Sequence, residues 1–144
     1  MAGVGGGLQD GDSIENAHHV MRYCRPKQVQ RGKITESAFA LREKEEYLSA
    51  NWLEYFNEGM QFPELLRKTR ETVGQSLNLP HNGRFAKIHV GDAKRKIKGV
   101  RIQYRPVDNN LAHAGIYPPS EENREITLEL ANLVSDSDIF SAVE

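Results

Sequence analysis

The sequence predicts a single small domain of the α+β class. In some segments apolar and polar residues alternate, as in strands with one buried face; in others apolar residues recur every three or four positions, as in amphipathic helices. The two kinds of segment are intermixed without strict alternation, which favours α+β. The 144 residues, of which 38% are hydrophobic, are sufficient to bury one core. We expect a mixed or antiparallel sheet and about three helices.

Composition places the borders of this domain near residues 17 and 135. Residues 1–16 contain five glycines and few large apolar side chains, so we expect a flexible arm. Residues 136–144 form an acidic tail. Within this tail, Ile139 and Phe140 either dock on a partner or fold back on the core of their own chain.

The stretch at residues 38–56 contains the only tryptophan, and we expect the core to form around it. Residues 38–41 have the apolar pattern of a short strand. Ser49 suits a helix N-cap, because its hydroxyl can accept a hydrogen bond from a backbone N–H of the first turn. Apolar residues around it recur every four positions and predict a buried helical stripe that ends near Gly59: Leu48, Trp52 and Phe56.

The remaining elements follow from the same periodicities. Further strands are predicted at residues 18–24, 84–90, 99–105 and 111–117. Helices are predicted at residues 62–77 and from an N-cap at Ser120 to about residue 134, with a single helical turn at residues 26–32. The strands near 84 and 105 alternate strongly, and we expect them to form an antiparallel hairpin around a charged loop.

Several classes of protein are disfavoured by what the sequence lacks. The single cysteine, Cys24, excludes an internal disulfide, and no apolar run approaches the roughly 20 residues of a membrane span. We find no signal-peptide pattern and therefore expect a cytoplasmic protein without membrane contact. Phosphate-loop, dinucleotide-binding and zinc-protease motifs are absent, and the scattered histidines predict no metal site. Cys24 is either a buried small apolar residue or a thiol activated by Arg25.

The order of residues between 18 and 56 resembles the small ADP-ribosyltransferase-like folds. Arg22 on the first strand, a turn ending in glycine, and a Tyr-x-Ser segment before a helix follow one another as in those folds. The resemblance implies a NAD pocket in which Arg22 holds a phosphate and Tyr47 stacks on a ring. Ser49 and Asn51 would form hydrogen bonds at a helix N-terminus. The glycine-rich segment of the toxin branch and a clear catalytic glutamate are missing. In the alternative, Arg22 pairs with a surface acid, Tyr47 is core and Ser49 only caps the helix.

The whole chain also resembles a group of small bacterial proteins that share four segments. These are Arg-Tyr-x-Arg-Pro, Ala-Phe-x-Leu-Arg, Leu-Ser-x-Asn-Trp-Leu-Glu and His-Ala-x-Ile, here at residues 22–26, 38–42, 48–54 and 113–116. If the segments converge in space, they form one polar cluster: Arg22, Arg25, Arg42, Asn51 and His113. His113 is the best candidate for a general acid or base, since its ordinary pKa lies near neutrality. Alternatively, it is a core histidine bonded to the backbone.

The charged residues are unevenly distributed, although the net charge is only -1. Between residues 92 and 105, six basic side chains stand against one acid, whereas residues 120–144 carry seven acids and one arginine. The basic side chains either contact nucleic-acid phosphates or belong to a solvated loop: Lys94, Arg95, Lys96, Lys98, Arg101 and Arg105. No exposed aromatic residue is interleaved with them for base stacking, because Tyr104 is expected to face inward.

Two functions from different classes therefore remain open. The favoured one is a small soluble accessory component of a larger bacterial assembly, as in defence or toxin systems, which binds another protein and uses no cofactor. Segregated charge and flexible termini favour it. The other is an ADP-ribosyltransferase-like enzyme or nucleotide-binding domain with NAD as its cofactor. Contact with a nucleic-acid backbone through residues 94–105 is a third hypothesis.

Overall fold

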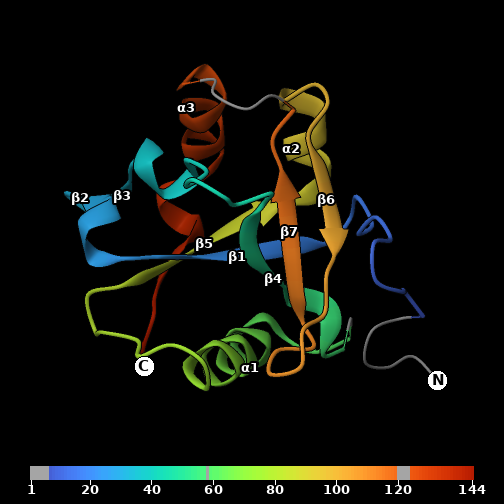
Figure 1. Cartoon of the computed structure of the whole chain (residues 1–144). Coiled ribbons are helices and arrows are strands. Elements are labelled where there is room, and N and C mark those ends of the chain that lie inside the picture. The colour runs from blue at the N-terminus through green and yellow to red at the C-terminus, as the bar shows by residue number, and fades with distance from the viewer. Residues whose placement is uncertain (1–6, 58, 120–123) are drawn as a thin grey trace.

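A six-stranded antiparallel sheet forms the centre of the protein in the computed structural model, which describes residues 7–57, 59–119 and 124–144 (Figure 1). Its strands are β1 (His19–Cys24), β4 (Leu48–Trp52), β5 (Arg84–His89), β6 (Arg101–Tyr104), β7 (His113–Tyr117) and β8 (Ile139–Ser141). They lie in the order β6-β7-β4-β1-β5-β8. Two short strands, β2 (Val29–Gln30) and β3 (Lys33–Ile34), form a separate hairpin. Its turn uses Arg31 and Gly32, both with positive φ, as a tight two-residue hairpin turn requires.

The helices lie on both faces of the sheet. They are α1 (Phe62–Gly74), α2 (Val90–Lys96) and α3 (Arg124–Leu133), with short 3-10 helices η1 (Pro26–Gln28), η2 (Glu36–Phe39), η3 (Leu53–Tyr55) and η4 (Asp136–Asp138). Figure 1 shows α1 on one side of the sheet and α2 and α3 on the other. The predicted α+β class is therefore confirmed.

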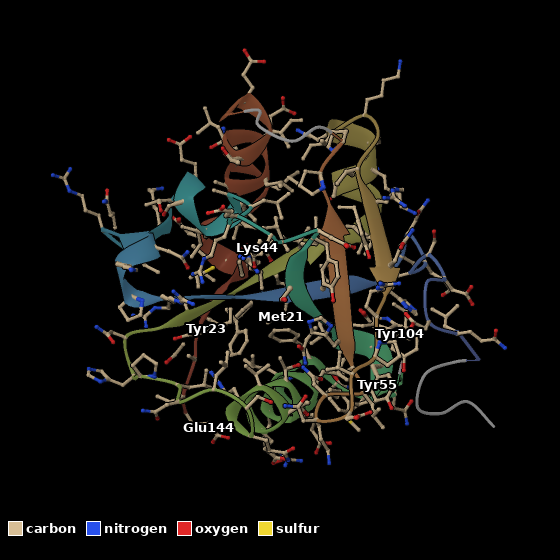
Figure 2. All side chains as sticks on the ribbon, viewed as in Figure 1. Met21, Tyr23, Lys44, Tyr55, Tyr104 and Glu144 are labelled. Carbon is tan, nitrogen blue, oxygen red and sulfur yellow. The ribbon has the colours of Figure 1, made fainter. Side chains whose placement is uncertain are left out.

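Two apolar cores result from the alternation of side chains along the strands. Val20 and Trp52 face a large core that also receives side chains from α2, α3 and η2. Met21 and Phe85 face a smaller core under α1, and in Figure 2 Met21 and Tyr23 lie between β1 and that helix. Among the described residues, the smaller core contains no side chain from β4, β6 or β7. Helix α1 therefore covers only part of its face of the sheet.

The predicted strands near residues 18–24, 84–90, 99–105 and 111–117 are confirmed, as is the helix that begins at Phe62. That helix ends at Gly74, earlier than predicted. The single turn at residues 26–32 is η1 followed by the β2–β3 hairpin. The expected N-cap Ser120 lies outside the described residues, and α3 is described from Arg124.

The central stretch was predicted with its two elements interchanged. Residues 38–41 contain the end of η2 instead of a strand, and the helix expected from Ser49 is strand β4 followed by η3. A spacing of four residues places side chains on one face of a helix, but it also places them on one face of a strand. Leu48 and Trp52 are both buried as predicted, but they share a face of strand β4 and not of a helix.

The predicted hairpin between residues 84 and 105 is wrong. Strands β5 and β6 are separated in the sheet by β1, β4 and β7, so they do not pair. The segment between them, expected as a charged loop, contains α2. Val90, Ala93 and Ile97 are buried, and their helical spacing is the signal in the sequence from which this helix could have been predicted. The side chain of His89 also caps it by accepting a hydrogen bond from the Asp92 N–H.

Parts of the predicted flexible arm and of the predicted acidic tail belong to the folded domain. Residues 1–6 of the expected arm lie outside the described residues, but Gly11 and Asp12 exchange backbone hydrogen bonds with Tyr104. Ile14 is fully buried, so residues 11–14 are docked rather than flexible. At the other end, Ile139 and Phe140 belong to β8, which pairs with β5. The acidic tail therefore folds back on its own core.

Candidate functional site

A gap between two central strands is filled by the side chain of an arginine. Strands β1 and β4 pair only at Val20 with Trp52 and at Met21 with Asn51. Beyond Met21 the guanidinium of Arg22 occupies the space between them. Its Nε donates to the Ala38 carbonyl at 2.8 Å and its Nη1 to the Ser49 carbonyl at 2.6 Å. Arg22 thus satisfies a carbonyl that has no strand partner on that side, and its side chain is held in one orientation.

This gap opens into a cleft of about 630 Å³, which we call the arginine cleft. Four cationic side chains and one carboxylate are among its lining residues: Arg22, Arg25, Lys27, Arg42 and Glu45. They come from β1, from η1 and the residue before it, and from the loop that precedes β4. The cleft therefore has an excess of positive charge, although the protein as a whole is nearly neutral.

The surroundings of Arg22 are unfavourable for another cation. Burial lowers the pKa of its guanidinium, the Glu45 carboxylate opposes this shift, and the charges of Arg42 and Arg25 lower the pKa further. An arginine nevertheless stays protonated near neutral pH. The cleft thus holds like charges close together, and an anion entering it reduces their repulsion.

A second cleft of about 250 Å³ adjoins the first and is called here the amide cleft. Asn51 and Asn110 bond to each other there, with Nδ2 of Asn110 donating to Oδ1 of Asn51 at 2.9 Å. Met21 and Phe85 are among its apolar lining residues. Tyr23, Ser49 and Leu77 line both clefts, which makes the two recesses neighbours.

His113 lines the amide cleft and is bonded to the backbone. Its Nδ1 lies 2.8 Å from the Arg105 carbonyl, so this nitrogen carries the proton and donates it. Burial lowers the pKa of His113; the bond to the Arg105 carbonyl opposes that shift, and the Arg105 charge adds to it. The geometry is that of a backbone-bonded histidine, which was one of the two alternatives. A role as general acid or base stays a prediction.

The cluster predicted from the sequence is thus divided between the two clefts. Arg22, Arg25 and Arg42 meet in the arginine cleft, while Asn51 and His113 meet in the amide cleft, and Ser49 belongs to both. The helix N-terminus expected at Ser49 and Asn51 does not exist, because both residues lie in β4. Those two side chains therefore gain no helix-dipole field for binding an anion.

Tyr47 lies outside both clefts, on the open part of the sheet. A Cβ atom at Gly115 would be 2.6 Å from the Tyr47 Cδ1 atom, so the ring lies directly on the backbone of β7. Its centroid is 5.1 Å from that of Tyr117. The guanidinium of Arg101 lies 4.6 Å from the Tyr117 ring centroid, and that of Arg105 lies 5.7 Å from the Tyr47 ring centroid.

The basic segment at residues 94–105 is divided between two structural environments. Lys94, Arg95 and Lys96 belong to α2, which packs on the large core, and Arg95 is paired with Asp92. Lys98 lies between α2 and β6. Arg101 and Arg105 instead contact tyrosine rings contributed by other segments. These aromatic neighbours, Tyr117 and Tyr47, could not be predicted from the basic segment, because they lie on β7 and just before β4.

Cys24 is fully buried, and burial raises the pKa of its thiol to about 12, although the nearby Arg22 charge opposes this shift. The alternative of a buried small residue is therefore the correct one. Among the described residues, no three histidine, cysteine, aspartate or glutamate side chains lie close enough to hold a metal ion. Within the same residues no helix has both the length and the apolar character that a membrane crossing requires.

Comparison of the chain with protein-family models, with curated proteins and with solved structures found no match. The interpretation of the two clefts therefore rests on their own residues and geometry.

Proposed function

We propose that the protein binds a phosphorylated ligand of nucleotide size in the arginine cleft. The observation that carries this proposal is the convergence of Arg22, Arg25 and Arg42 on one recess from two separate segments, β1 with the residue after it and the loop before β4. Guanidinium groups match phosphate in both charge and planar donor geometry, and several of them together favour a ligand with more than one negative charge.

The shape of the cleft supports a small ligand or one segment of a larger one. Its volume of about 630 Å³ falls within the range of small-molecule sites. Arg22 is already oriented by the Ala38 and Ser49 carbonyls, so less side-chain entropy is lost when a ligand binds. The neighbouring amide cleft offers apolar surface and amide groups, which suit the base of a nucleotide.

This proposal concerns binding and assigns no reaction. NAD remains one of the candidate ligands, although the helix N-terminus that the resemblance implied is absent. The hypothesis of an accessory component of a bacterial assembly is compatible with ligand binding and stays a prediction. So does a cytoplasmic location.

The proposal is tested by thermal unfolding of the purified chain with pyrophosphate, ATP and NAD at millimolar concentrations. A ligand at a hundredfold excess over its Kd adds about 2.7 kcal/mol to the free energy of unfolding. Arg25→Ala and Arg42→Ala are expected to abolish most of this gain while leaving the free protein folded, because both side chains are exposed. Arg22→Ala is less suitable, since Arg22 also bonds two carbonyls.

The matched control is Arg31→Asn, which removes one exposed positive charge outside the cleft and keeps a residue that tolerates the positive φ of this turn. It should retain the full ligand-dependent gain. If none of the three ligands stabilises the wild-type protein, or if Arg31→Asn loses as much as Arg42→Ala, the proposal is wrong.

A further inference from the structure

The open part of the sheet presents a pair of aromatic rings outside the apolar core that α1 covers, as far as the described residues show. We call Tyr47 and Tyr117 the tyrosine platform. On the opposite face of β4, β7 and β6, three side chains are fully buried under α2, α3 and η2: Leu48, Ile116 and Ile102. Both tyrosines are only half-buried. Burial raises the pKa of Tyr117, so its phenol stays neutral near pH 7. The rings are thus uncharged, and a base that stacks on the face of Tyr117 next to Arg101 takes the place of that guanidinium.

Cations flank this platform. Arg101 lies over the Tyr117 ring, and Arg105 lies near the Tyr47 ring with its Nη1 3.4 Å from Oδ1 of Asp10. Asp10 is an exposed carboxylate, so this pair is solvated and contributes little that a phosphate would have to replace. The Glu46 carboxylate raises the pKa of Tyr117, whereas the charges of Arg105 and Arg101 lower it.

The platform and the arginine cleft belong to one continuous surface. Tyr47 immediately precedes β4, and Ser49 is the second residue of that strand. Ser49 lines the arginine cleft, and Tyr47 lies on Gly115, the residue paired with Ser49 across β7. A ligand in which flat rings alternate with anionic groups can therefore contact the tyrosine platform and the arginine cleft at the same time.

Resting on the proposed function, we infer that the ligand of the arginine cleft is a single-stranded nucleic acid whose neighbouring bases stack on Tyr47 and Tyr117. Single strands expose the faces of their bases, and proteins that bind them combine aromatic rings with a positively charged groove along the backbone. A duplex keeps its bases stacked on one another and offers no free base face to the platform. Arg101 and Arg105 then contact phosphates next to the stacked bases, while Arg25 and Arg42 hold a phosphate in the cleft.

The test uses the full chain and a fluorescent oligothymidylate of about 12 nucleotides, a length within the range that single-strand-binding domains cover. Fluorescence anisotropy measures its Kd, and pyrophosphate binding is measured in parallel by calorimetry. Tyr117→Leu removes the ring, and we expect it to weaken oligonucleotide binding about tenfold because a stacked base is lost. The same variant should leave pyrophosphate binding unchanged.

Two further variants separate stacking from structural effects. Tyr117→Phe keeps a ring and should retain oligonucleotide binding, which a general loss of fold would not allow. Arg42→Ala should weaken binding of both the oligonucleotide and pyrophosphate. Arg101→Gln should lower the magnitude of the salt-dependence slope by about 0.7, the value for one phosphate contact of a single strand.

The outcomes distinguish this inference from the proposed function. If pyrophosphate binds but the oligonucleotide binds no more tightly, or if Tyr117→Leu has no effect on it, the inference is overturned and the phosphate site stands. If a duplex of the same length competes as well as the single strand, stacking on the platform is also excluded. If neither pyrophosphate nor the oligonucleotide binds, the phosphate site itself is wrong.

Discussion

Arg22 and Cys24 lie on the same face of β1, but only the Arg22 side chain reaches solvent. The Arg22 guanidinium is bonded to two carbonyls and reaches the arginine cleft, whereas the Cys24 thiol is fully enclosed. A buried thiol loses the solvation that a thiolate needs, and the nearby guanidinium does not compensate for this loss. Cys24 is therefore a packing residue, and Arg22 is the residue of this pair that can contact a ligand.

Cys24 should be unreactive in the folded protein. Because burial raises its pKa to about 12, only a negligible fraction is thiolate at pH 8, and the sulfur is also inaccessible. An aromatic disulfide reagent should label the thiol slowly in native buffer and rapidly in guanidinium chloride. Fast stoichiometric labelling of the native protein would contradict the burial of this side chain.

The same shift predicts a dependence of stability on pH. A thiol whose pKa is raised on folding ionises first in the unfolded chain, so the folded state binds more protons above about pH 9. The free energy of unfolding should therefore fall as the pH rises from about 9 towards 12. Denaturant melts of Cys24→Ala over this range should lack that part of the decrease; an identical slope in both proteins would argue against the shift.

Single residues of the site were only partly predictable. The sequence indicated Arg22, Arg25 and Arg42 because they lie in two of the segments that resemble a group of small bacterial proteins, and these three residues do share a cleft. It did not indicate that Arg22 bonds the Ser49 carbonyl, since that contact depends on the separation of two strands. Nor did it indicate that Tyr47 lies on Gly115, which is 68 residues away in the chain (115 − 47).

At the scale of the element, β4 is the strand on which both clefts depend. Its Trp52 is almost fully buried, contacts the rings of Tyr55 and Tyr104, and donates from Nε1 to Nδ1 of His18 at 3.0 Å. Figure 2 shows Tyr55 and Tyr104 close together near the end of β6. The tryptophan therefore anchors one end of β4 in the large core.

Replacing this anchor should be costly. Trp52→Ala should lower the free energy of unfolding by about 3–5 kcal/mol, because it leaves a large cavity in a packed core. Urea melts followed by circular dichroism measure the loss. Leu111→Ala is a suitable control, since Leu111 is 55% exposed and should cost less than about 0.5 kcal/mol. A loss below about 1 kcal/mol for Trp52→Ala would contradict the assigned core.

Strands and helices with a clean periodicity were predicted correctly, and short apolar stretches were not. Apolar and polar residues alternate from residue 86 to residue 90, whereas the four-residue spacing around Trp52 fits a helix and a strand equally well. The prediction failed there because three consecutive residues of β4 are buried. Such a strand lacks the alternation that distinguishes it from a helix.

For the whole molecule, the class of the fold was predictable but the strand order was not. Local periodicity is enough to indicate α+β, whereas pairing β1 with both β4 and β5, and β6 with β7, depends on contacts between distant segments. The expected hairpin followed from sequence proximity alone. This order matters for function, because it leaves β4, β7 and β6 open on the face beside α1 and brings the two clefts together.

The central claim is that Arg22 and Arg42 contact one phosphate-bearing ligand, and side-chain NMR tests it most directly. The Nε–Hε signal of Arg22 should be observable at mildly acidic pH, because this proton is bonded to the Ala38 carbonyl and exchanges slowly. Titration of the labelled protein with pyrophosphate should shift the Arg22 and Arg42 signals with one saturating Kd. Arg67, which is paired with Glu71 on α1, should not shift. Unchanged Arg22 and Arg42 signals at millimolar pyrophosphate, or an equal shift of Arg67, would contradict the account.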